Sequence, residues 1–88
     1  MAKVFSEVKR VHEKEEWFDE YARQCTIVRD AWLAREGADR GTRLDLEAEI
    51  DKIENISFWF LLGVRLAGKI SIEEFTTLRL HMFGVWCN

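Results

Sequence analysis

The chain has 88 residues, 48% hydrophobic and 33% charged, with a formal net charge of −3. This length allows one domain with a single core, and the composition is that of a globular protein. The 13 lysines and arginines are scattered among 16 acidic residues, so no basic stripe can neutralise a phosphate backbone and nucleic-acid binding is disfavoured. The longest mainly apolar run, 56–62, is too short to span a membrane, and the N-terminus has no apolar region followed by a cleavage site. We therefore expect a cytoplasmic protein without a membrane partner.

The first predicted element is a long helix over 4–36. Apolar residues recur along it at three- and four-residue spacing, which is the period of one helical face. Gly37 follows directly and is expected to end the helix. The residues of this stripe are Val4, Val8, Val11, Phe18, Ala22, Cys25 and Trp32.

A second predicted helix covers 43–67, after a short polar loop. Thr42 is the expected N-cap, and Asp45 in the first turn favours the positive end of the helix dipole. The run 56–62 is apolar nearly all round, which is typical of a helix surrounded by other helices. Gly63 lowers helix stability by about 1 kcal/mol relative to alanine, which is tolerable if it lets another backbone approach.

A third predicted helix covers 72–83. Gly68 can end the preceding helix in the left-handed conformation. Ser71 and Glu74 then form an S-x-x-E capping box, in which each side chain satisfies a backbone N–H of the first turn. Gly84 is expected to end this helix.

These elements predict an all-α fold in which 1–88 form a single domain. The two long helices form an antiparallel hairpin, with Leu33 near Leu46 and Phe18 near Leu61. The short third helix, about 18 Å long, packs at the end distant from the loop.

The third helix is too short to cover the half of the hairpin near the loop. We therefore expect that half to be an interface, where the chain forms a dimer or higher oligomer or binds another protein. If the first helix bends or breaks near 13–16, a monomeric three-helix bundle becomes possible and this expectation weakens. The predicted interface residues are Cys25, Val28, Trp32, Leu46 and Ile50.

Acidic pairs at helical spacing are the main candidate for chemistry. Glu16 with Asp19 or Glu20, and Asp51 with Glu54, place two carboxylates on one helix face. This pattern resembles the all-helical nucleoside-triphosphate pyrophosphohydrolases of the MazG type, whose E-x-x-E and E-x-x-D pairs hold magnesium, and the resemblance implies a magnesium role for these five residues. The acids are permuted relative to that family, and no cluster of lysine and arginine is placed to read a triphosphate. A solvated charged face accounts for the same residues.

The histidines and cysteines predict no site of their own. His12 lacks the second histidine of an H-E-x-x-H zinc motif, and Cys25 and Cys87 do not form a C-x-x-C motif. His81 fits a structural position near a helix end. We therefore predict no catalytic residue, no metal and no cofactor.

Four tryptophans and six phenylalanines are a large aromatic content for this length, and aromatic side chains are enriched at the centres of interfaces. The favoured function is a small non-enzymatic protein-interaction module: an adaptor, regulator or inhibitor, of a kind that phages also encode, that associates with itself and with a macromolecular partner. Two alternatives stay open. One is the magnesium-dependent pyrophosphohydrolase, and the other is an oligomeric nucleotide-binding sponge.

Overall fold

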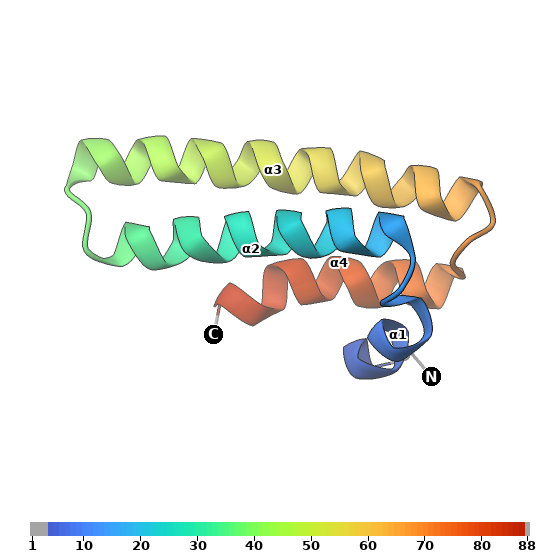
Figure 1. Cartoon of the computed structure of the whole chain (residues 1–88). Helices are drawn as coiled ribbons and strands as arrows, with labels where there is room; N and C mark the ends of the chain where they lie inside the picture. The colour runs from blue at the N-terminus through green and yellow to red at the C-terminus, as the bar shows by residue number, and fades with distance from the viewer. Residues whose placement is uncertain (1–3, 88) are drawn as a thin grey trace.

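The computed structural model describes the backbone of residues 4–87 and the side chains of residues 4–82. All of its described regular secondary structure is helical (Figure 1), which confirms the predicted all-α class. The helices are α1 (Phe5–His12), α2 (Glu16–Glu36), α3 (Arg40–Leu66) and α4 (Ile72–Cys87).

Helices α2 and α3 are joined by a short loop and run antiparallel, side by side (Figure 1). Near the loop, Arg35 Nε donates a hydrogen bond to Glu47 Oε1 at 2.7 Å. Midway along the pair, the buried Ser57 hydroxyl donates to Gln24 Oε1. Both pairings agree with the register expected from the sequence to within about one helical turn.

Helix α4 packs beneath this pair, at the end distant from the loop and towards its middle (Figure 1). The buried Tyr21 hydroxyl of α2 donates a hydrogen bond to the backbone carbonyl of Leu78 in α4. On the α3 side, the ring of Phe75 lies 6.1 Å from that of Phe58, and the Arg79 guanidinium lies 4.4 Å from the centre of the Phe58 ring. Helix α4 is therefore anchored to both members of the pair.

The predicted continuous helix over 4–36 is wrong, because the chain breaks between α1 and α2. Glu15 is extended, with φ −86° and ψ 141°. A straight helix over 4–36 would be about 50 Å long, whereas the longest dimension of the molecule is 42 Å. The break lets α1 pack against α4 and bury Val8 completely, so tertiary packing overrides the helix propensity of the charged residues 13–16.

Two predicted helix boundaries also differ from the structure. Asp39, not Thr42, is the N-cap of α3, since its carboxylate accepts a hydrogen bond from the backbone N–H of Thr42 at 2.8 Å. The α3 helix therefore begins at Arg40, about one helical turn before the predicted start at residue 43. Helix α4 continues past Gly84 to Cys87, because a helical glycine lowers stability without being able to end a helix alone.

The turn between α3 and α4 is as predicted. Gly68 has a positive φ of 77°, which glycine adopts without steric cost. The Glu74 backbone N–H donates to Ser71 Oγ at 3.1 Å, and the Ser71 backbone N–H donates to Glu74 Oε1 at 2.9 Å. This reciprocal pair confirms the capping box.

None of the helices in the described part of the chain combines the length and the hydropathy that a membrane crossing requires.

Candidate functional site

The predicted interface residues divide into two groups. Cys25, Val28 and Ile50 are buried in the chain's own core, while Trp32 and Leu46 are partly buried and pack against that core. Helices α2 and α3 pack directly on each other near the loop, so they cover the facing stripe without a third helix. A partner at this end stays a prediction, and of the five predicted residues only Trp32 and Leu46 are exposed enough for a partner to reach.

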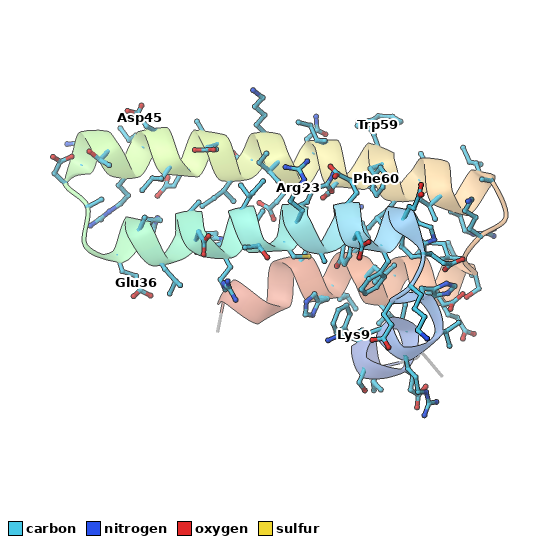
Figure 2. All side chains as sticks on the ribbon, viewed as in Figure 1. Lys9, Arg23, Glu36, Asp45, Trp59 and Phe60 are labelled. Carbon is cyan, nitrogen blue, oxygen red and sulfur yellow. The ribbon has the colours of Figure 1, made fainter. Side chains whose placement is uncertain are left out.

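A different apolar surface lies on the side of α3 that faces away from α2. It consists of Ile56, Trp59, Gly63 and Leu66, which we call the outer seam. The spacings of three, four and three residues put these positions on one helical face. Ile56 is 45% exposed, Trp59 62% and Leu66 78%. Figure 2 shows Trp59 pointing away from α2, whereas its neighbour Phe60 points between α2 and α3.

None of the four residues of the outer seam is charged, and residues 55–64 include no aspartate, glutamate, lysine or arginine. The sequence predicted that a run apolar on all sides would be surrounded by helices, and this is wrong. Helix α4 packs against α3 through Phe58, on another side of the helix, and leaves Trp59 and Leu66 exposed. Large apolar side chains grouped on one exposed face mark a surface suited to binding.

Gly63 is not required by the packing of the monomer. A Cβ atom placed on it would meet nothing within 4 Å. A glycine in a helix interior lowers stability by about 1 kcal/mol relative to alanine. The monomer therefore gains nothing from this residue, although it lies between the two most exposed side chains of the outer seam.

The acidic pairs are not assembled into a metal site. Glu20 accepts a hydrogen bond from Arg23 Nε at 3.0 Å and is thus part of an exposed ion pair on α2. Asp51 and Glu54 line a shallow open groove on α3 together with Arg79. Burial raises the pKa of Glu54, and the negative charge of Asp51 raises it further, whereas Arg79 opposes both.

Within residues 4–82, no group of three or more histidine, cysteine, aspartate or glutamate side chains is placed to hold a metal ion. The structure therefore does not join the five candidate magnesium ligands, Glu16, Asp19, Glu20, Asp51 and Glu54. A magnesium ion has octahedral coordination and requires several oxygen ligands that converge on one point.

A partly buried polar cluster holds α1 against α4. Nε2 of His12 lies 2.8 Å from Glu74 Oε2, and Nδ1 is hydrogen-bonded to Glu15 Oε2. Trp17 Nε1 donates to the same Glu15 oxygen at 3.2 Å. An imidazole that meets a carboxylate at both nitrogens satisfies both when it is protonated and donates twice.

The electrostatics of this cluster favour the imidazolium form. Burial lowers the pKa of His12, but the hydrogen bonds and negative charges of Glu15 and Glu74 outweigh it, so that the pKa is raised above its ordinary value. The same Glu74 carboxylate accepts from Ser71 in the capping box. One side chain thus both starts α4 and holds the end of α1.

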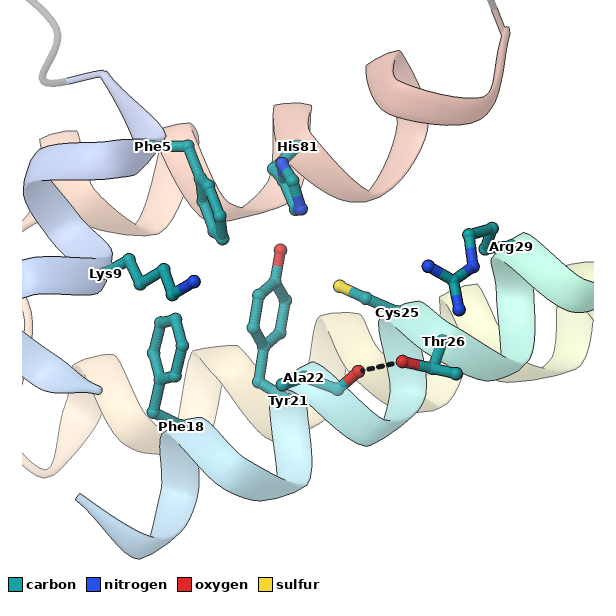
Figure 3. Close-up of a pocket in the computed structure, with 9 residues that line it drawn as sticks. All are labelled: Phe5, Lys9, Phe18, Tyr21, Ala22, Cys25, Thr26, Arg29 and His81. Atoms are coloured by element: carbon teal, nitrogen blue, oxygen red, sulfur yellow. Dashed lines mark hydrogen bonds between the residues drawn. The ribbon is translucent and has the colours of Figure 1, made fainter. Parts of the chain in front are cut away.

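A cavity of about 220 Å³ opens between α1, α2 and α4 (Figure 3). Its wall is mostly aromatic and apolar, and the ring of His81 stacks on that of Phe5 with centroids 3.5 Å apart. Lys9 and Arg29 approach it from opposite sides (Figure 3). The lining residues are Phe5, Lys9, Phe18, Tyr21, Ala22, Cys25, Thr26, Arg29 and His81.

Burial favours the neutral forms of three titratable side chains of this cavity, Tyr21, Cys25 and His81. Burial raises the pKa of the Cys25 thiol and of the Tyr21 phenol, and burial lowers the pKa of His81. A nucleophilic cysteine requires the opposite shift, because the thiolate is the reactive form. Cys25 and His81 therefore lie near each other without the chemistry of a nucleophile and base.

Comparison of the chain with protein-family models, with curated proteins and with solved structures finds no match. The assignment of function therefore rests on the surfaces and side chains described above.

Sequence reasoning missed both the outer seam and the His12 cluster. The spacing of Ile56, Trp59, Gly63 and Leu66 was visible in the sequence, but only the position of α4 decides which side of an apolar helix stays exposed. The separation of His12 and Glu15, three residues, gave a signal for their contact, whereas the partnership with Glu74 depends on the break after α1.

Proposed function

We propose that this chain is a non-enzymatic protein-interaction module whose docking surface is the outer seam of α3. The observation that carries the proposal is the exposure of Ile56, Trp59 and Leu66 on one uncharged helical face around Gly63. Roles open to such a module include those of an adaptor, a regulator and an inhibitor.

The size of the exposed side chains supports this proposal. Complete burial of a large aliphatic side chain contributes about 1.5 to 3 kcal/mol. Trp59 adds the largest aromatic surface, and tryptophan is the residue type most enriched among those that dominate binding energies. The centres of interfaces are also depleted in charge, as the outer seam is.

The shape of the surface indicates what binds there. A single row of apolar side chains, about three helical turns long, matches the row that another amphipathic helix presents. Gly63 lowers the middle of the row and lets such a helix approach closely. We therefore expect the bound element to be a helix.

The test compares two substitutions of exposed residues on α3. Trp59→Glu places a charge in the outer seam, whereas Leu44→Glu changes a side chain that is 57% exposed but lies outside it. Both variants should keep the wild-type Tm in dilute solution. We expect Trp59→Glu to lose association, measured as solution mass by sedimentation velocity and as proteins retained from the source cells, and Leu44→Glu to keep it.

Two results would contradict the proposal. One is association that survives in Trp59→Glu. The other is loss of association in Leu44→Glu alone, which would move the interface to the loop end, where Trp32 and Leu46 were expected to contact a partner.

A further inference from the structure

We infer that the helix received by the outer seam is α3 of a second copy of this chain, in antiparallel register, with Trp59 of each copy opposite Gly63 of the other. This inference rests on the proposed function and names its partner. It follows from the order of large and small residues along the seam.

The seam is complementary to itself when reversed. Its positions, 56, 59, 63 and 66, are symmetric about position 61, so an antiparallel copy places 56 opposite 66 and 59 opposite 63. Ile56 then meets Leu66, and Trp59 meets Gly63, at both ends of the pair. Every position of the seam finds an apolar partner.

Side-chain size selects this register over a parallel one. In a parallel pair, Trp59 would oppose Trp59 and hold the helices apart, while Gly63 opposite Gly63 would leave a void. In the antiparallel pair, each indole fills the space that the missing Cβ of Gly63 leaves open. Within the monomer nothing lies within 4 Å of that position, so an indole from outside can occupy it.

The pairing closes on itself. A two-fold axis relates the copies, and both use the same surface, so the assembly ends at the dimer. The seam is only about 15 Å long from Ile56 to Leu66. Such an interface belongs to the small class, below about 1,200 Å² in total, and we expect the dimer to dissociate on dilution.

Cysteine cross-linking tests the register. In a Cys87→Ser background, Ile56→Cys and Leu66→Cys are prepared separately, oxidised alone, and oxidised as an equimolar mixture. Cys25 is buried and is present in every sample. We expect the mixture to form the 56–66 disulfide dimer, identified by peptide mass, much faster than either variant forms a dimer alone. In the antiparallel pair, identical positions lie about 15 Å apart.

A second variant tests the space at Gly63. Gly63→Leu should fold, since Gly63 is exposed and a Cβ there meets no neighbouring atom of the monomer, but the leucine should fill the space that the indole requires. We expect its dimer to dissociate at least tenfold more readily than the wild type in sedimentation velocity. Ala48→Leu places the same side chain at an exposed α3 position outside the seam and should leave the dimer unchanged.

The outcomes separate this inference from the proposed function. Cross-linking of identical positions, or a Gly63→Leu dimer as stable as the wild type, would overturn the inferred register. A wild-type chain that stays monomeric at its highest attainable concentration, while Trp59→Glu loses a different protein, would overturn the second copy as partner and leave the proposed function standing. If Trp59→Glu changes no association at all, the proposed function itself fails.

Discussion

Helix α3 has two apolar faces, of which one is buried and the other is exposed. Its inner face, which includes Ile50, Leu61 and Val64, is buried against the rest of the chain. Its outer face carries Trp59 and Leu66, which stay exposed. Both faces show helical periodicity, so hydropathy alone does not distinguish a core from a docking surface. The difference lies in which side the other helices occupy.

The comparison is tested most strongly by matched truncations of the two faces. Leu61→Ala removes a fully buried side chain and should lower the free energy of unfolding by about 2 to 5 kcal/mol. Leu66→Ala removes the same atoms from the outer face and should change it by less than about 0.5 kcal/mol in dilute solution. Urea denaturation of both variants gives the two values. Equal losses would show that the outer face belongs to the monomer's core.

The sequence was sufficient for the parts of this fold that depend on local chemistry. The all-helical class, the loop after Glu36, the left-handed Gly68 and the capping box at Ser71 all follow from residues close together in the chain. The break before α2 did not follow, because glutamate and lysine favour helix. The break is stabilised only by distant contacts of α1 with α4, such as that of His12 with Glu74, and by the burial of Val8. The outer seam was missed for the same reason, since it depends on where α4 packs.

A smaller loss of stability is expected when the polar contact between α1 and α4 is weakened than when the inner face of α3 is truncated. Glu74→Gln keeps a residue that can complete the capping box with Ser71 but removes the charge facing His12. A hydrogen bond to a charged group contributes about 1.5 to 3 kcal/mol, and we expect a loss of this order at pH 6. Thermal or urea unfolding across pH measures it.

The sign of the pH dependence follows from the raised pKa of His12. A raised pKa in the folded state means that the stabilisation is fully present below the unfolded value, about 6.5, and decreases as the pH rises through the folded value. The difference between wild type and Glu74→Gln should therefore shrink above pH 6.5. A difference that grows with pH would contradict the ion pairs of His12 with Glu15 and Glu74.

Tyr21→Phe tests the contact between α2 and α4. The phenol hydroxyl is buried and donates to the backbone carbonyl of Leu78, so its removal should cost about 1 kcal/mol. The ring stays in place and the apolar packing is unchanged. Urea denaturation should show this loss with the same m-value as the wild type, and an unchanged midpoint would show that the hydrogen bond adds nothing.

The smallest expected effect has the opposite sign. Gly63→Ala should stabilise the dilute monomer by about 0.5 to 1 kcal/mol, because alanine favours the helix and meets no neighbouring atom. Gly68→Ala is the matched control, and it should destabilise by about 1 kcal/mol, since its φ of 77° is unfavourable for a residue with a Cβ. Thermal unfolding in dilute solution measures both. Destabilisation by Gly63→Ala would mean that the monomer itself requires this glycine.

The most direct test of the central claim, that the outer face of α3 serves association and not the fold, is the Tm of the wild type and of Trp59→Glu over a wide range of protein concentration. Association that stabilises the folded state makes the Tm depend on concentration. We expect the Tm of the wild type to rise with concentration, that of Trp59→Glu to stay constant, and the two to coincide when dilute. A wild-type Tm independent of concentration would contradict self-association through this face. A variant Tm that is lower even in the most dilute sample would show that the face belongs to the fold.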